Sequence, residues 1–123
     1  MTKSSIIRQV VDLQAQAERL IRTGGNIPEI EAFSQYNDEI KTYLLDHIND
    51  EFVFNYIKTI PSLDINAIEI KSGIITVILG LFAGGTSAAY NERQKIERAL
   101  EQIKEISNKY SSYEMMIRNC FDN

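Results

Sequence analysis

The sequence predicts an all-α protein, a compact bundle of four to five helices with a long C-terminal helix. Apolar side chains recur at alternating steps of three and four residues along most of the chain, the period of one helix face. Pairs of glycines and single prolines lie between these periodic stretches, where helices end. A chain of 123 residues with 44% hydrophobic and 24% charged side chains is typical of one globular domain, covering 1–123.

The first helix is predicted over residues 4–23 and is stopped by Gly24-Gly25. Glycine reaches the left-handed conformation that ends many helices without the steric cost that a Cβ atom brings. The expected buried stripe of this helix contains Ile6, Val10, Leu13, Ala17 and Leu20.

Two further helices follow. The second begins near Pro28, because proline lacks an N–H group that the first helical turn would leave without a partner. The third is short, begins at a cap supplied by Asn49 or Asp50, and is closed by Pro61. Their expected buried stripes are Ile30, Phe33, Ile40, Leu44 and Ile48 for the second helix, and Phe52, Val53, Tyr56, Ile57 and Ile60 for the third.

Residues 62–83 allow two interpretations. Read as a helix capped by Ser62, they place apolar side chains at steps of 4, 3, 4, 3 and 4, which is the favoured interpretation. Read as strands, 68–71 alternates in polarity, Ser72-Gly73 resembles a tight turn, and 74–79 is a β-branched apolar run. The alternative fold is therefore α+β, with a β-hairpin at about 65–80.

The last helix is predicted over residues 87–118, and it is too long for a compact domain. At 1.5 Å per residue it measures about 48 Å, whereas the radius of gyration of a compact chain of this size is about 14 Å. The helix either breaks near Ser107-Asn108 or Ser111-Ser112, or projects and packs against a partner, which includes a second copy of the chain. We favour projection.

The apolar face of this helix and the tail that follows it form the predicted partner-binding surface. Two adjacent methionines lie in the tail, and flexible thioether side chains adapt well to a binding surface. For the tail alone, packing of Met116, Ile117 and Phe121 in the core is the favoured interpretation, and an adaptable binding surface is the alternative. The residues expected to bind a protein partner or a second copy are Ile96, Leu100, Ile103, Tyr110, Tyr113, Met116, Ile117 and Phe121.

Residues 72–90 form a stretch without charged side chains. The length of this stretch is close to the roughly twenty residues that a membrane-spanning helix needs. Only 74–83 is densely apolar, however, and a stretch of that length is more typical of a core helix. The alternative function is therefore a small membrane-associated or membrane-inserting protein that uses Ile74, Ile75, Val77, Ile78, Leu79, Leu81 and Phe82.

Catalytic and metal-binding side chains are scarce. His47 lies near Asp46, Asp50 and Glu51, but a helix boundary is expected within this group and a metal site needs three or four convergent ligands. Cys120 lacks a neighbouring base in the sequence. We therefore expect no enzyme activity, no metal, no cofactor and no small-molecule substrate.

The net charge of −4 makes nucleic acid an unlikely partner. A single cysteine fits a reducing compartment, and the charged first 25 residues lack the apolar stretch of a signal peptide. We expect a cytoplasmic protein, with membrane association as the alternative. The predicted function is a non-enzymatic helical interaction module: an adaptor, an inhibitor, an immunity-like factor or a subunit of a larger assembly.

Overall fold

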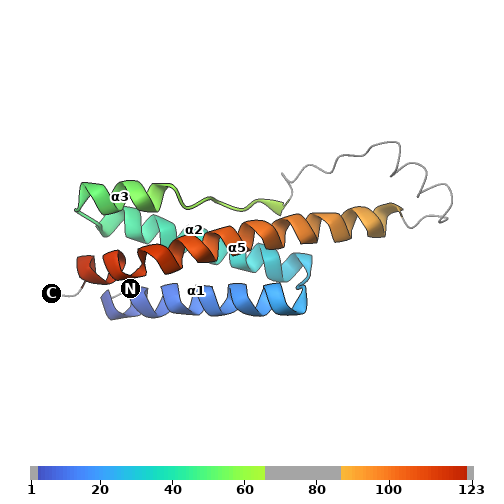
Figure 1. The fold of residues 1–123 in the computed structure, drawn as a ribbon, viewed down its shortest axis with the longest axis horizontal. Coiled ribbons are helices and arrows are strands. Elements are labelled where there is room, and N and C mark those ends of the chain that lie inside the picture. Colours follow the sequence, from blue (N-terminus) through green and yellow to red (C-terminus); the bar gives the residue numbers. More distant parts are fainter. Residues whose placement is uncertain (1–2, 66–86, 122–123) are drawn as a thin grey trace.

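The computed structural model describes residues 3–65 and 87–121, and all regular elements in those ranges are helices (Figure 1). They are α1 (Lys3–Thr23), α2 (Ile27–His47), the short α3 (Glu51–Lys58) and α5 (Ser87–Phe121). The prediction of an all-α fold with a long C-terminal helix is confirmed. Most of the predicted helix at 62–83, the alternative hairpin and the seven residues of the membrane alternative lie outside the described residues.

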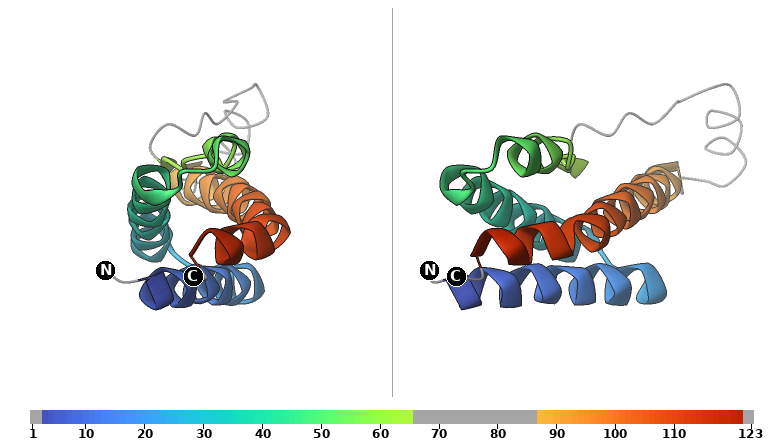
Figure 2. Two further views of the ribbon diagram at one scale, coloured as in Figure 1. Left: turned by 90° about the vertical axis from the view of Figure 1, so that its left-hand side faces the viewer. Right: turned by 60° about the vertical axis from the view of Figure 1, so that its left-hand side comes forward.

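The helices run alternately up and down, and both chain termini lie at the same end of the bundle (Figure 1). Seen end-on in Figure 2, α1 and α3 lie on opposite sides of the core, with α2 and α5 between them. The most extensive packing is between α1 and α5. Because α3 has only eight residues, it covers only part of the fourth side, and the chain continues in the same direction as an extended segment.

Helices α1 and α2 bury the stripes that their periodicity predicts, whereas α3 buries only part of its stripe and leaves Tyr56 partly exposed. All five predicted residues of α1 are at most 1% exposed, and the five predicted for α2 are at most 6% exposed. In α3, Val53 and Ile57 are buried, and Ile60 beyond it is also buried. Phe52 was expected to point inward, but its side chain is 65% exposed. An eight-residue helix buries one narrow face, and Phe52 lies about 100° around the helix from Val53.

The buried face of α5 overlaps only in part with the apolar face that the sequence predicts. Its buried residues are Ala99, Ile103, Ile106, Tyr110, Ile117 and Phe121. Ile96 and Leu100, which were expected to bind a partner, are partly buried, and at about 100° per residue both lie on the same side of Ala99 around the helix. A prediction based on the largest apolar side chains therefore omits the small Ala99, although Ala99 lies in the buried face.

The last helix does not break at either of the two serine-containing steps that were considered, since α5 runs from Ser87 to Phe121 without interruption. At 1.5 Å per residue its 35 residues measure about 52 Å, against about 32 Å for the 21 residues of α1. The N-terminal part of α5 therefore extends beyond the corner that joins α1 to α2, as Figure 1 shows.

Two glycines form the corner between α1 and α2, as the sequence predicts. Gly24 and Gly25 have φ angles of +86° and +54°, in the left-handed region that favours glycine. The N–H of Gly24 donates to the carbonyl of Leu20 at 2.8 Å and closes the helix. A Cβ atom on Gly25 would approach Leu20 Cδ2 to 2.9 Å, whereas a Cβ atom on Gly24 would enter open space.

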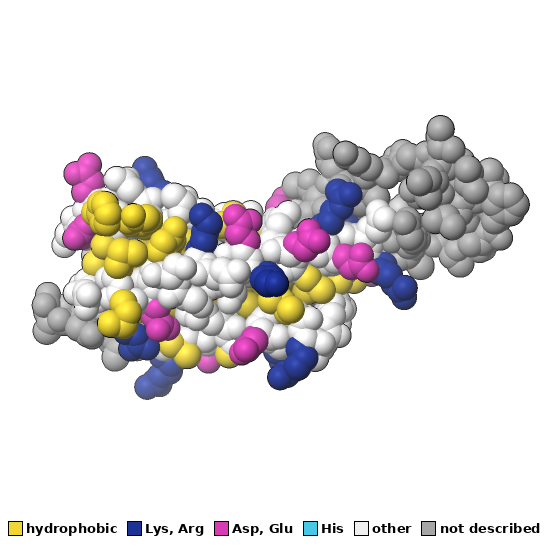
Figure 3. Space-filling model, viewed as in Figure 1, with side chains coloured by type: hydrophobic (Ala, Val, Ile, Leu, Met, Phe, Trp, Pro, Cys, Tyr) yellow, Lys and Arg dark blue, Asp and Glu magenta, His cyan; other side chains and the backbone are white. Residues whose placement is uncertain are grey.

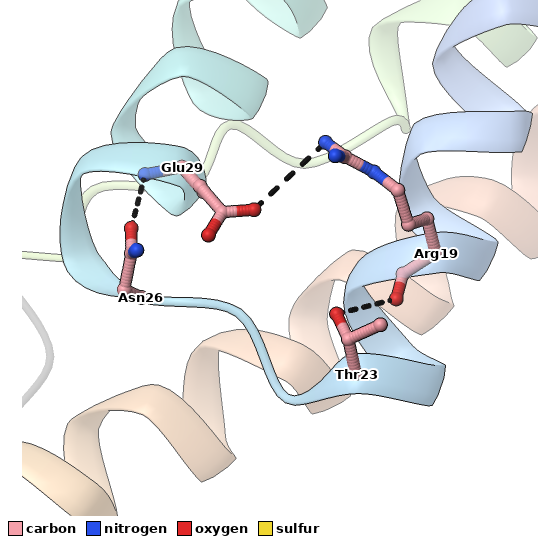
Figure 4. A network of polar contacts seen from close by, with 4 residues as sticks. All are labelled: Arg19, Thr23, Asn26 and Glu29. Carbon is pink, nitrogen blue, oxygen red and sulfur yellow. Dashed lines mark hydrogen bonds and ion pairs between the residues drawn. The ribbon is translucent and has the colours of Figure 1, made fainter.

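Polar side chains complete this corner (Figure 4). The side-chain oxygen of Asn26 accepts from the backbone N–H of Glu29 at 2.9 Å and caps α2. The Glu29 carboxylate lies 3.9 Å from the guanidinium of Arg19, and the Thr23 hydroxyl donates to the Arg19 carbonyl at 2.8 Å. The ion pair is exposed and contributes little to stability, so the cap and the glycines determine the corner.

An extended segment, residues 60–65, follows α3 and is called the strap. Its side chains Ile60, Leu63 and Ile65 are buried in the core. Polar side chains of α2 donate to its carbonyl groups: Lys41 Nζ to Ile60 (2.6 Å), Asn37 Nδ2 to Pro61 (3.1 Å) and Ser34 Oγ to Leu63.

The strap corrects the prediction of a helix that begins at Ser62, because residues 62–64 are not helical. Side chains of α2 instead satisfy the backbone carbonyl groups of this extended segment.

A buried polar junction joins α5, α2 and the strap. The Tyr110 hydroxyl of α5 donates to Asn37 Oδ1 at 2.8 Å, while Asn37 Nδ2 donates to the strap. Both side chains are fully buried. Burial, and to a smaller extent the charge of Asp38, raise the pKa of Tyr110 far above its usual value of 10.0. The folded protein therefore strongly favours the neutral hydroxyl.

We predict that Gly25→Ala destabilises the protein more than Gly24→Ala does. Both alanines would adopt a left-handed conformation at a cost of about 1–2 kcal/mol, but only the methyl group at position 25 also displaces the buried Leu20. Urea unfolding followed by circular dichroism gives both values. Equal losses would contradict the contact with Leu20.

We predict that the Tyr110 hydroxyl makes stability fall at alkaline pH. Its pKa is raised in the folded state, so its contribution is complete below pH 10.0 and is lost as the pH rises above that value. The loss reaches up to about 1.4 kcal/mol per pH unit. Urea unfolding at several pH values should give a shallower decline for Tyr110→Phe than for the wild type. Parallel declines would contradict this assignment.

Candidate interaction surface

The eight residues predicted to bind a partner divide into two groups. Ile103, Tyr110 and Ile117 are fully buried, and Phe121 is 6% exposed. These four side chains are part of the core of their own chain, so a partner cannot reach them while the bundle is intact. Ile96, Leu100, Tyr113 and Met116 are partly buried and pack at the edge of the core.

Ile96 and Leu100 line one side of an open hollow of about 460 Å³ between α5 and the corner of α1 and α2. Gly24 and Gly25 lie on its other side, and Glu92, Arg93 and Glu97 surround it. Charges of both signs therefore border this hollow.

Tyr113 and Met116 lie at the opposite end of the bundle, where α3 packs beside the last turns of α5. Hydrophobic side chains gather over this end in Figure 3. The rings of Phe52 and Tyr56 meet edge-on with centroids 4.8 Å apart, and the rings of Tyr56 and Tyr113 lie 5.1 Å apart. We call Phe52, Tyr56, Tyr113 and Met116 the end patch.

Local structure explains why Phe52 faces solvent. The carboxylate of Asp50 accepts from the backbone N–H of Val53 at 3.1 Å, which begins α3 and directs Val53 into the core. The preceding residue is then turned outward. The hydroxyls of Thr59 and Tyr113 lie 3.2 Å apart, so the Tyr113 ring is held beside Tyr56.

A second open hollow, of about 490 Å³, adjoins the end patch and is called the end hollow. Phe52 and Met116 form part of its lining, together with His47, Asp50 and Cys120. The His47 ring stacks on the ring of Tyr43 with centroids 4.0 Å apart, and its Nδ1 lies 2.9 Å from the Tyr43 carbonyl oxygen.

The fold thus brings His47 and Cys120 to one hollow despite their separation in the sequence. Burial, and then the charge of Asp50, raise the pKa of the Cys120 thiol. A raised pKa lowers the fraction of thiolate, which is the reactive form of a cysteine. Within residues 3–65 and 87–121, no three histidine, cysteine or acidic side chains are placed to hold a metal ion.

Comparison of the chain with protein-family models, curated proteins and solved structures finds no match. Among the described residues, no helix combines the length and the apolar character needed to cross a membrane.

Sequence reasoning missed Phe52, the most exposed ring of the end patch. The sequence feature that could have predicted its outward orientation is Asp50, a strong helix N-cap. A cap at position 50 and a buried Val53 together determine which side of α3 faces the core.

Proposed function

We propose that the protein is a non-enzymatic helical interaction module that binds a protein partner or a second copy through its C-terminal helix, with the end patch as the contact. The observation that carries the proposal is Phe52, whose side chain is 65% exposed although the core beneath it is complete. Phe52 belongs to a group of neighbouring aromatic rings, and contiguous exposed apolar patches mark interaction sites, where aromatic side chains often dominate the binding energy.

The composition of the end patch supports this use. Three aromatic rings and one thioether are grouped on α3 and α5, and an aromatic side chain buries about 150–250 Å² when it is covered. At about 25 cal/mol per Å² of apolar area, covering the exposed part of the Phe52 ring contributes about 3 kcal/mol before the costs of association.

The chemistry of the end hollow supports a binding role over catalysis. A thiol with a raised pKa and a histidine stacked on Tyr43 do not form an activated nucleophile and base. The lone cysteine of the chain also supports the proposal of a cytoplasmic location, where thiols stay reduced.

A photo-crosslinking amino acid at position 52 tests the proposal directly. The matched control is the same amino acid at Val11, which is 44% exposed on α1. The proposal expects a discrete crosslinked product from position 52 in an extract of the native cells, identified by mass as a second copy or another protein. No product, or the same products from position 11, would contradict it.

We predict that Phe52→Ala leaves the free energy of unfolding within about 0.5 kcal/mol of the wild type, because the ring is mostly exposed. Ile57→Ala, at a fully buried position of the same helix, should cost about 2–5 kcal/mol. Urea unfolding compares the two variants. Equal destabilisation by both would place the Phe52 ring in the core and remove the basis of the proposal.

A further inference from the structure

An acidic hollow lies on α2 next to the end hollow. It is shallow, with a volume of about 700 Å³, and Asp38, Glu39 and Asp46 supply its three charged side chains. The rest of its lining is neutral: Ser34, Gln35, Thr42 and Tyr43. No lysine or arginine lines it.

The two hollows are neighbours. Tyr43 lines the acidic hollow, and its ring stacks on the ring of His47, which lines the end hollow with Asp50 and Phe52. Together the two hollows are lined by four carboxylates: Asp38, Glu39 and Asp46 lie on α2, and Asp50 lies beside the end patch.

The nearby cations are engaged elsewhere. The side chain of Arg118 lies 3.7 Å from the carboxylate of Glu114, and Lys58 lies 5.0 Å from the ring centroid of Phe54. Lys41 donates to the strap at 2.6 Å. Within the described part of the chain, no ion pair involves any of the four carboxylates. Their field selects a positively charged occupant.

Resting on the proposed function, we propose that this surface binds a basic amphipathic helix of a protein partner. The apolar face of that helix covers Phe52 and Met116, while its lysines or arginines face the carboxylates of α2. Asp38 and Asp46 are eight residues apart, or about 12 Å along the helix, so the partner presents cations about two turns apart. A helix satisfies its own backbone hydrogen bonds and needs only such side-chain contacts.

A second copy of the chain fits this surface less well. The exposed arginines of α1 include Arg8, Arg19 and Arg22, but α1 and α3 lie on opposite sides of the bundle (Figure 2). Pairing the basic face of one copy with the end patch of another is head-to-tail, and such contacts generate open chains unless they close into a ring.

Synthetic peptides test the charge preference. Three helical peptides of about 18 residues share one leucine stripe and one tryptophan, and carry lysine, glutamine or glutamate at the other positions. The protein contains no tryptophan, so tryptophan fluorescence reports only on the peptide. We expect the lysine peptide to bind at least about tenfold more tightly than the glutamate peptide, and to weaken as salt rises from about 50 mM to about 500 mM.

Variants locate the binding. The double variant Asp38→Asn, Asp46→Asn should lower the affinity for the lysine peptide by about tenfold. The control Asp12→Asn, Glu18→Gln on α1 removes the same amount of charge and should change that affinity by less than about twofold. Phe52→Ala should weaken the lysine and glutamine peptides alike, because it removes the apolar anchor.

The outcomes separate this inference from the proposed function. If the glutamine or glutamate peptide binds as tightly as the lysine peptide and still responds to Phe52→Ala, the basic partner is wrong and the end patch remains a binding surface. If both double variants weaken the lysine peptide equally, its binding is not localised, and the inference fails. Light scattering that shows chains of copies dispersed by Phe52→Ala would assign the surface to a second copy instead.

Discussion

The amide of Asn37 is the polar group on which the arrangement of the bundle depends. A buried amide without partners costs several kcal/mol, and its oxygen and nitrogen need partners of opposite kind. Tyr110 of α5 supplies a donor to the oxygen, and the Pro61 carbonyl of the strap accepts from the nitrogen. A shift of α5 by one residue, or a helical strap, would leave one of these groups unpaired. The junction therefore selects one register among several that apolar packing alone would tolerate.

The candidate binding surface follows from the same constraint. Side chains at positions 34, 37 and 41 hold the strap along α2. Because α3 directly precedes the strap, this short helix is restrained at the end of the bundle beside the last turns of α5. Its cap at Asp50 then directs Val53 inward and leaves Phe52 outside. The acidic residues of α2 belong to the helix that holds the strap, so the polar and apolar parts of the surface share one rigid support.

Periodicity predicted α1 completely, because its five apolar residues repeat without a gap and two glycines end it. It missed Asn37, although this residue fills the gap between Phe33 and Ile40 in the buried stripe of α2. A polar residue in that register depends on a partner far away in the sequence, which local pattern cannot supply. The small Ala99 and the outward Phe52 were missed because hydrophobicity ranks side chains by size and character, whereas burial depends on which face meets a neighbour. Of the predicted partner-binding residues, Tyr113 and Met116 lie in the end patch and stay a prediction, whereas four others are in the core.

A double-mutant cycle on Asn37 and Tyr110 tests this account most directly. Tyr110→Phe removes the donor and should cost about 1–3 kcal/mol, because Asn37 Oδ1 stays buried without a partner. Asn37→Leu removes the amide and leaves the hydroxyl and the Pro61 carbonyl unpaired. If the junction acts as a unit, the double variant loses less stability than the two single losses added together, by about 1 kcal/mol or more. Additive losses, within about 0.3 kcal/mol, would show that the two side chains act independently and would contradict the central role of the junction.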